Sequence, residues 1–352
     1  MVSQLVLTQT LRIGGLVKHG FVPALCCLVL LTQPFRILAE SGGIFQTVYL
    51  GFPAYEITDG LTRAVIVPEL AGRVMFYGWM EGENLIWNAS GLDATSPREG
   101  FVNWGGDKTL VGPHEIWGQY SERRWPPRPS WMSEPHMARV EDEGRSLVTE
   151  GPAWEGFALR VVRRYRYAGE GSLEITQTLE KTDETAEALA VWSVAQVNPP
   201  DQAYVLRDPG NEASEGFRYT NQRQSSMPIF RLTPGLLGVG FQPLGATKVS
   251  FDSPQTALAA RWGDTLWIQR GTLREGALIA DPAFQTPPVE IYHQGREEDN
   301  YVELELMSPA VRLTPNRPAR FVTHWSLFKV DGKMPSVFEL LQPEAFKHGA
   351  TP

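Results

Sequence analysis

The chain has 352 residues, of which 42% are hydrophobic and 20% charged, a composition typical of a soluble globular protein. That length allows two domains, but a single large β-sandwich also accounts for it. The formal net charge is −8, so the surface should repel nucleic acid, and we expect no nucleic-acid partner.

Residues 1–39 have the features of an export signal. Basic residues (Arg12, Lys18) precede the apolar core Phe21–Leu31, which is shorter than the roughly 17–25 residues that span a bilayer. Ala39 provides the small residue at which signal peptidase cuts. We therefore expect a periplasmic or secreted protein that has no membrane contact once the signal is cleaved. An uncleaved N-terminal anchor is the alternative.

Both cysteines, Cys26 and Cys27, lie inside this segment. A chain cut after Ala39 therefore forms no disulfide and no thiolate metal site. Cleavage removes three basic residues and no acidic one, which changes the net charge from −8 to −11. The remaining histidines lack metal-ligand spacing, so we expect no metal site and no cofactor. Calcium sites built from Asp and Glu stay open.

From Ile44 onward, short runs of alternating apolar and polar residues are separated by glycine-containing turns, a pattern typical of β-strands. The predicted strands are Tyr55–Thr58, Leu61–Leu70, Arg73–Met80, Glu83–Asn88, Ala138–Glu141, Ser146–Thr149, Phe157–Tyr167, Ser172–Lys181, Leu189–Val197, Ile229–Leu232, Gly238–Phe241, Lys248–Phe251, Ala257–Arg261, Leu266–Arg270, Val289–His293, Tyr301–Met307 and Ala319–Val330. Asp208–Ser226 is predicted to be a loop, and Pro335–Phe346 a C-terminal helix. So many strands with so little helix predict an all-β fold whose sheets pack face to face. We expect one domain over 44–330 and a tail over 331–352.

The stretch Phe101–Trp131 is the most distinctive part of the sequence. It holds four of the eleven tryptophans, namely Trp104, Trp117, Trp125 and Trp131. Gly105–Gly106 and Pro126–Pro127 interrupt regular structure, which predicts a long, functional loop. Aromatic faces beside polar side chains suit a sugar, with its apolar ring face and hydroxyl rim. A buried tryptophan-rich plug that closes the sandwich is the alternative.

The same stretch contains candidate polar contacts. Asp107 and Lys108 follow two glycines, so their backbone could approach a ligand closely; a surface ion pair between them is the alternative. His114 is a candidate general acid, because histidine titrates near neutral pH. Arg124, next to Arg123, could bind a carboxylate or a phosphate in bidentate fashion, which would suit an acidic sugar. A structural histidine and surface salt bridges are the alternatives for these last residues.

The predicted strand Tyr301–Met307 carries candidate carboxylates. Its period of two places Glu303 and Glu305 on one face and the apolar residues between them on the other. Two carboxylates one strand repeat apart, about 7 Å, raise the pKa of one of them, which suits a base near neutral pH. An ordinary solvated strand face is the alternative.

Three segments occur in a characteristic order: Ala64–Asn88 (AVIVPELAGRVMFYGWMEGENLIWN), Asn103–Lys108 (NWGGDK) and Tyr301–Phe328 (YVELELMSPAVRLTPNRPARFVTHWSLF). Their order and spacing resemble the galactose mutarotase-like (aldose 1-epimerase-like) superfamily, in particular a bacterial branch of it. The resemblance covers roughly 44–330. It implies a β-supersandwich of large antiparallel sheets, with a sugar site on an open concave face.

The resemblance also implies the interconversion of sugar anomers by a glutamate base and a histidine acid. Family position favours Glu305 as the base and Glu303 as the second choice. Trp104 and Gln196 stand near positions where the family has histidines. Together, the central stretch and the resemblance indicate Glu305, Glu303 and His114 as catalytic candidates, and Asn103, Trp104, Asp107, Lys108, Trp117, Arg124, Trp125, Arg73 and Gln196 as substrate contacts.

We therefore expect an exported carbohydrate-binding protein that interconverts sugar anomers. A sugar-binding or structural module without catalysis is one alternative, favoured by the missing histidine. A polysaccharide lyase or glycosidase on a related sandwich is another. All sugar-site interpretations require that Phe101–Trp131 and the strand with Glu303 and Glu305 face each other across one pocket.

Overall fold

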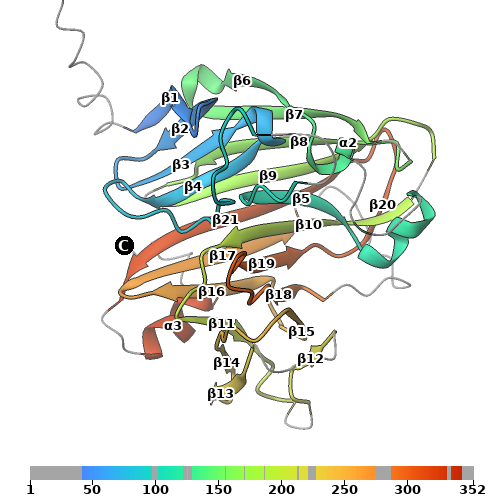
Figure 1. Ribbon diagram of the computed structural model, residues 1–352. Helices are drawn as coiled ribbons and strands as arrows, with labels where there is room; N and C mark the ends of the chain where they lie inside the picture. Colours follow the sequence, from blue (N-terminus) through green and yellow to red (C-terminus); the bar gives the residue numbers. More distant parts are fainter. Residues whose placement is uncertain are drawn as a thin grey trace, which may run out of the picture.

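The computed structural model describes residues 42–96, 102–121, 125, 129–154, 156–169, 171–185, 187–211, 214–220, 227–273, 287–330 and 334–342. The predicted signal segment 1–39 lies outside these ranges. Within them, antiparallel strands form three sheets (Figure 1). The predicted all-β fold is confirmed.

The smallest sheet is an N-terminal meander of four strands. Its strands are β1 (Gly43–Tyr49), β2 (Phe52–Thr58), β3 (Thr62–Val67) and β4 (Arg73–Trp79), in that order. The short helix η1 (Pro68–Leu70) joins β3 to β4. Because side chains alternate along a strand, the sheet buries residues on both faces, Ile66 in the main core and Val65 in a smaller core with Trp104.

The second sheet has seven strands. Their order is β12 (Phe217–Tyr219), β15 (Thr247–Phe251), β18 (Val289–His293), β19 (Val302–Met307), β10 (Glu187–Val197) and β20 (Val311–Leu313), and β5 (Asp107–Gly112) also pairs with β10. Strand β10 therefore has β19 on one side and β5 on the other. This arrangement connects the tryptophan-rich stretch with the strand that carries Glu303 and Glu305.

The third sheet has ten strands. Their order is β13 (Ile229–Thr233), β14 (Leu236–Val239), β11 (Gln202–Leu206), β16 (Ala257–Trp262), β17 (Thr265–Leu273), β21 (Ala319–Lys329), β9 (Ser172–Lys181), β8 (Leu159–Tyr167), β7 (Ser146–Trp154) and β6 (Met137–Glu141). Residues from this sheet and from the seven-stranded sheet share the main core. Trp267 and Trp325 pack edge to face there, with ring centroids 4.7 Å apart.

The remaining helices are short. They are η2 (His114–Gln119), α2 (Pro129–Met132), η3 (Asp142–Gly144) and α3 (Met334–Leu341). Helix α3 confirms the predicted C-terminal helix; its Val337 and Leu341 pack against the ten-stranded sheet in a separate apolar cluster. Among the described residues, no helix has the length and apolar character needed to cross a membrane.

Several sequence predictions were wrong in detail. Asp107–Gly112, predicted as loop, is strand β5, and β11, β12 and β20 were not predicted. The predicted strand Glu83–Asn88 forms only isolated bridges at Ile86 and Asn88. Strand β5 has charged residues at its start, whose partners Arg163 and Glu303 come from β8 and β19, and periodicity along one segment does not show this.

Candidate active site

Strand β19 places its acidic residues on the face of the sheet opposite to Val302, Leu304 and Leu306. Val302, Leu304 and Leu306 are fully buried in the main core, whereas Glu303 and Glu305 alternate with them. The predicted period of two is therefore confirmed. Cross-strand pairing sets Glu303 opposite Gln196 and Tyr292, and Glu305 opposite Val194 and Glu290.

A pocket of about 520 Å³ lies on this face. Its lining includes His114, Trp192, Arg218, Lys248, Ser250, Glu290 and Met307. His114 comes from η2, inside the tryptophan-rich stretch, and Met307 ends β19. Both segments that the sugar-site interpretation pairs thus contribute to this pocket, but Glu303 and Glu305 are not among its lining residues.

Glu305 is held by two side chains that line the pocket. The Trp192 indole Nε1 donates to Glu305 Oε2 at 2.7 Å, and Lys248 Nζ donates to Oε2 at 2.8 Å and Oε1 at 3.1 Å. Glu305 itself is only 1% exposed. Burial raises the pKa of Glu305 to about 8, against the opposing charge of Lys248 and with support from Glu290 and Glu303.

Sequence reasoning missed the neighbours of Glu305. Lys248 Nζ also lies 3.0 Å from Glu290 Oε2, and Ser250 Oγ donates to Glu290 Oε1 at 2.5 Å. Burial opposes the charge of Lys248, yet Glu305 and Glu290 together raise its pKa above the usual value. The alternation of Lys248–Phe251 and Val289–His293 could have assigned these side chains to one face. The order of the strands, which brings them together, is a tertiary property.

A second polar group lies around Glu303. Its Oε1 accepts a hydrogen bond from Lys108 Nζ at 3.0 Å and another from Gln196 Nε2 at 2.9 Å. Burial lowers the pKa of Lys108, although Glu303 partly opposes this shift. Asn103 is hydrogen-bonded to Tyr301, next to Glu303 along the same face. The structure thus brings Asn103, Lys108, Gln196 and Glu303 to the same face of the sheet.

Asp107 lies on the other side of β5. Its Oδ1 accepts a hydrogen bond from the Val74 backbone N–H at 2.6 Å, and its Oδ2 pairs with Arg163. The residue is 0% exposed, and successive strand residues point to opposite faces. The predicted ligand contact at Asp107 is therefore corrected to a structural ion pair, and the predicted alternative, an ion pair with Lys108, does not form.

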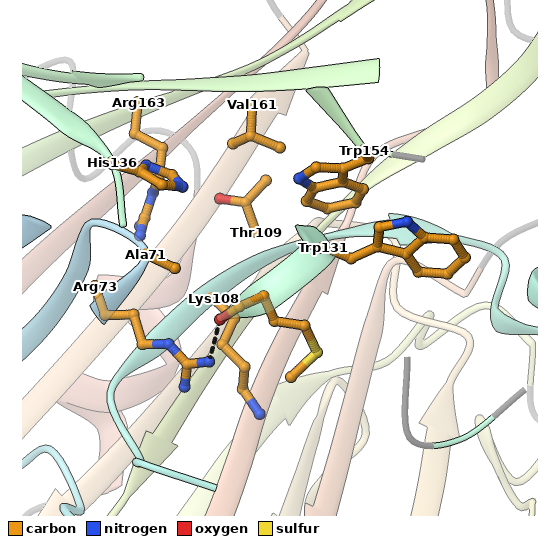
Figure 2. A pocket seen from close by; sticks show the side chains of 10 residues that line it. Ala71, Arg73, Lys108, Thr109, Trp131, His136, Trp154, Val161 and Arg163 are labelled. Atoms are coloured by element: carbon orange, nitrogen blue, oxygen red, sulfur yellow. Dashed lines mark hydrogen bonds between the residues drawn. The ribbon is translucent and has the colours of Figure 1, made fainter. Parts of the chain in front are cut away.

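Arg73 is also structural. Its guanidinium donates to the carbonyls of Gly105 at 2.6 Å and Met132 at 2.9 Å, and the side chain is almost fully buried. It lines a cavity of about 20 Å³, with room for about one water molecule. Figure 2 shows Arg163 and Trp154 on the far side of this cavity from Arg73. The predicted sugar contact of Arg73 is replaced by its hold on two loop carbonyls.

The tryptophans divide into core and surface residues. Trp104 packs in the small core beside the four-stranded sheet, and Trp117 is 0% exposed and donates to the Val111 carbonyl at 2.8 Å. The predicted sugar contacts of Trp104 and Trp117 are therefore wrong. Both residues are buried, as the alternative of a buried tryptophan-rich plug predicted. Trp125 is 50% exposed and stacks on Trp117. Its ring centroid lies 6.4 Å from that of His114. Arg124 lies outside the described residues.

The two glycines of the stretch serve the backbone and not a ligand. Gly105 and Gly106 have φ values of +84° and +76°. A Cβ at Gly105 would lie 2.1 Å from the Trp87 carbonyl oxygen. Only glycine permits this approach together with this backbone conformation.

The fold of this chain is similar to that of solved galactose mutarotase-like proteins. One from Clostridium acetobutylicum is 11% identical and superposes with a TM-score of 0.52, covering 82% of this chain and 98% of that chain. Another, from Lactobacillus casei, is 10% identical with the same TM-score, covering 78% of this chain and 100% of that chain. The chain has a galactose mutarotase-like fold. The predicted sandwich architecture is confirmed, and at these identities the similarity concerns the fold alone.

A third similar structure is a TPR-domain-containing protein from Parabacteroides distasonis, 14% identical with a TM-score of 0.49. The match covers 88% of this chain, which spans 61% of that longer protein. No protein-family model matches the chain, and no curated protein sequence matches it.

Proposed function

We propose that this protein binds a carbohydrate in the pocket beside β19 and interconverts the anomers of the bound sugar. The observation that carries the proposal is the buried Glu305 carboxylate, held by Trp192 and Lys248, two side chains that line the pocket. An indole ring offers an apolar face, and the charged groups around it offer hydrogen bonds to hydroxyls. The galactose mutarotase-like fold supports the same substrate class.

Anomer interconversion needs a base and an acid. The base takes the proton of the anomeric hydroxyl while the bond between C1 and the ring oxygen breaks, and the acid protonates that oxygen. Ring closure on the other face of C1, with the two proton transfers reversed, gives the other anomer. Glu305 suits the base, because its pKa of about 8 lies close to neutral pH. His114 lines the same pocket and suits the acid.

Carbohydrate binding without catalysis is the second candidate function. Strand β10 presents Trp192 and Gln196 toward this face and has no histidine. Glu305 is only 1% exposed, which keeps it from direct contact with a ligand unless a neighbour moves. Both features favour a sugar-binding module that keeps the fold.

Export to the periplasm or the medium is part of the proposal. It rests on the basic and apolar pattern of residues 1–39.

The deciding experiment uses the purified mature chain, residues 40–352. Thermal-shift screening against monosaccharides and oligosaccharides finds ligands, and saturation-exchange NMR of a ligand's two anomers measures interconversion. Faster exchange supports the isomerase, and binding without faster exchange supports the module. A chain that binds no sugar contradicts both. Glu305→Gln should reduce affinity or exchange, while Glu297→Gln, at an exposed position, serves as the matched control.

A further inference from the structure

We propose that Glu290, and not Glu305, is the carboxylate that meets the sugar, and that Lys248 joins the two carboxylates into one proton-sharing unit. This inference rests on the proposed function of the pocket. It assigns the contact to a residue on β18, whereas sequence reasoning assigned it to β19.

The geometry of the unit is compact. Lys248 Nζ lies 2.8 Å from Glu305 Oε2 and 3.0 Å from Glu290 Oε2, so one ammonium group bridges both carboxylates. Glu290 and Glu305 are direct cross-strand partners in the register of β18 and β19. Directly opposite residues of an antiparallel pair project to the same face, about 4.5–5.5 Å apart at Cβ.

The two carboxylates differ in their access to the pocket. Glu290 lines it and is 8% exposed, whereas Glu305 is 1% exposed and contacts two lining side chains. Ser250 Oγ donates to one oxygen of Glu290 and Lys248 to the other, which fixes the carboxylate plane at the pocket wall. A ligand in the pocket therefore reaches Glu290 without displacing Lys248 or Trp192.

Charge makes the two groups interdependent. Four charged groups lie nearest to Glu305, namely Lys248, Glu290, Glu303 and Lys108. The pocket lining adds His114, Glu115 and Arg218. One lysine cannot fully compensate two carboxylates in a buried site, so a proton on one of them stabilises the ionised form of the other. Burial raises the pKa of Glu305, Lys248 opposes the shift, and Glu290 adds to it.

This coupling suits reversible proton transfer. Glu305 holds a proton below about pH 8. Glu290 takes the proton of the anomeric hydroxyl and becomes neutral, which removes a negative charge beside Glu305 and weakens its hold on that proton. When the ring closes, the proton returns from Glu290 to the sugar oxygen, which restores the starting charges of the unit. Glu290 is then a catalytic residue, and Glu305 is a positioning residue that acts through Lys248.

The test compares Glu290→Gln, Glu305→Gln and the exposed control Glu297→Gln in the mature chain. For a sugar found in the panel, Glu290→Gln should slow anomer exchange by about 100-fold or more, as the loss of a general base does. Glu305→Gln should retain more of the exchange and shift its pH profile. If the protein binds without exchange, Glu290→Gln should cause the larger loss of affinity. The inference is overturned if Glu290→Gln leaves the exchange rate and the affinity unchanged, or if Glu305→Gln reduces them more than Glu290→Gln does.

A second measurement needs no sugar. Trp192 contacts both Lys248 and Glu305, with Lys248 Nζ 4.6 Å from the ring centroid, so its fluorescence should report the unit. The difference in emission between the wild type and Trp192→Phe should titrate with pH. Because the His114 ring lies 6.2 Å from the Trp192 ring, the titration is measured in a His114→Gln background. There, Glu305→Gln should abolish the titration, and Glu290→Gln should move its midpoint to lower pH, because a negative neighbour is removed. If the Trp192 emission does not titrate, or if Glu290→Gln leaves the midpoint unchanged, the two carboxylates do not form a shared unit, whether or not a sugar binds. A protein that binds no sugar but shows the shift contradicts only the proposed function.

Discussion

The indole N–H of Trp192 lies 2.7 Å from Glu305 Oε2. The ring that lines the pocket therefore also holds the carboxylate beside it, and Lys248 completes the same contact from β15. A ligand that contacts Trp192 or Lys248 would change the surroundings of the buried Glu305. Binding and protonation should consequently depend on each other.

Stability should depend on the protonation of Glu305. Its pKa is about 8 in the folded protein against an ordinary 4.5, so the folded state holds a proton that the unfolded state loses between these values. The contribution is fully present below about pH 4.5 and disappears as the pH rises through 8, with a slope of up to about 1.4 kcal/mol per pH unit. Urea unfolding from pH 5 to 9 should show a weaker decline for Glu305→Gln than for the wild type. If the free energy of unfolding declines equally with pH in the wild type and in Glu305→Gln, Glu305 is not protonated in the folded state.

The ion pair of Asp107 and Arg163 should be important for stability, because both side chains are buried. Asp107→Asn leaves the Arg163 charge without its partner and should lower the free energy of unfolding by about 3–5 kcal/mol. Chemical denaturation measures this loss. The matched control is Asp264→Asn, whose carboxylate pairs with Lys329 at an exposed site. The control should change stability little, and an equally mild Asp107→Asn would refute the structural role.

Gly105 should tolerate no side chain. Gly105→Ala places a Cβ 2.1 Å from the Trp87 carbonyl oxygen, in addition to the strain of a positive φ. Gly91 has a similar φ of +72°, but open space around its Cβ position. Gly91→Ala should therefore cost only the backbone strain, about 1–2 kcal/mol. Gly105→Ala should cost clearly more, measured by thermal and chemical unfolding. Similar losses would show that the close approach is unimportant.

Trp117 and Trp125 should respond differently to truncation. Trp117 is 0% exposed, and Trp117→Ala should destabilise the fold by about 3–5 kcal/mol. Trp125 is half exposed near His114, so Trp125→Ala should keep the fold and weaken sugar binding. Unfolding curves and ligand titrations of both variants separate these effects. Unchanged affinity of Trp125→Ala would remove this residue from the proposed site.

The N-terminal segment should be removed on export. Expressed from its full sequence in a bacterium with a periplasm, the protein should be recovered outside the cytoplasm with Glu40 as its first residue. Fractionation followed by mass spectrometry of the intact chain checks both. Replacing Ala39 with a bulky residue should block cleavage. Full-length protein in the membrane fraction would instead support the uncleaved anchor.

Local patterns sufficed for many of the strands. Alternating hydrophobicity predicted β9, β18 and β19 closely, because each strand has one face toward the main core. It failed for β5, where charged residues occupy a strand whose partners come from distant segments. The glycines at Gly105–Gly106 predicted a close approach of the backbone. The sequence does not show that the neighbour at Gly105 is the Trp87 carbonyl, which makes glycine necessary there.

The sequence by itself determined the all-β class and the face of β19 that carries Glu303 and Glu305, because both depend on a period of two within single segments. Only the tertiary structure decided which charges meet. The order of the strands unites Lys248, Glu290 and Glu305, and the two faces of β5 separate Lys108 from Asp107. Contacts between distant segments depend on strand order and register, which the residues of any one segment do not specify.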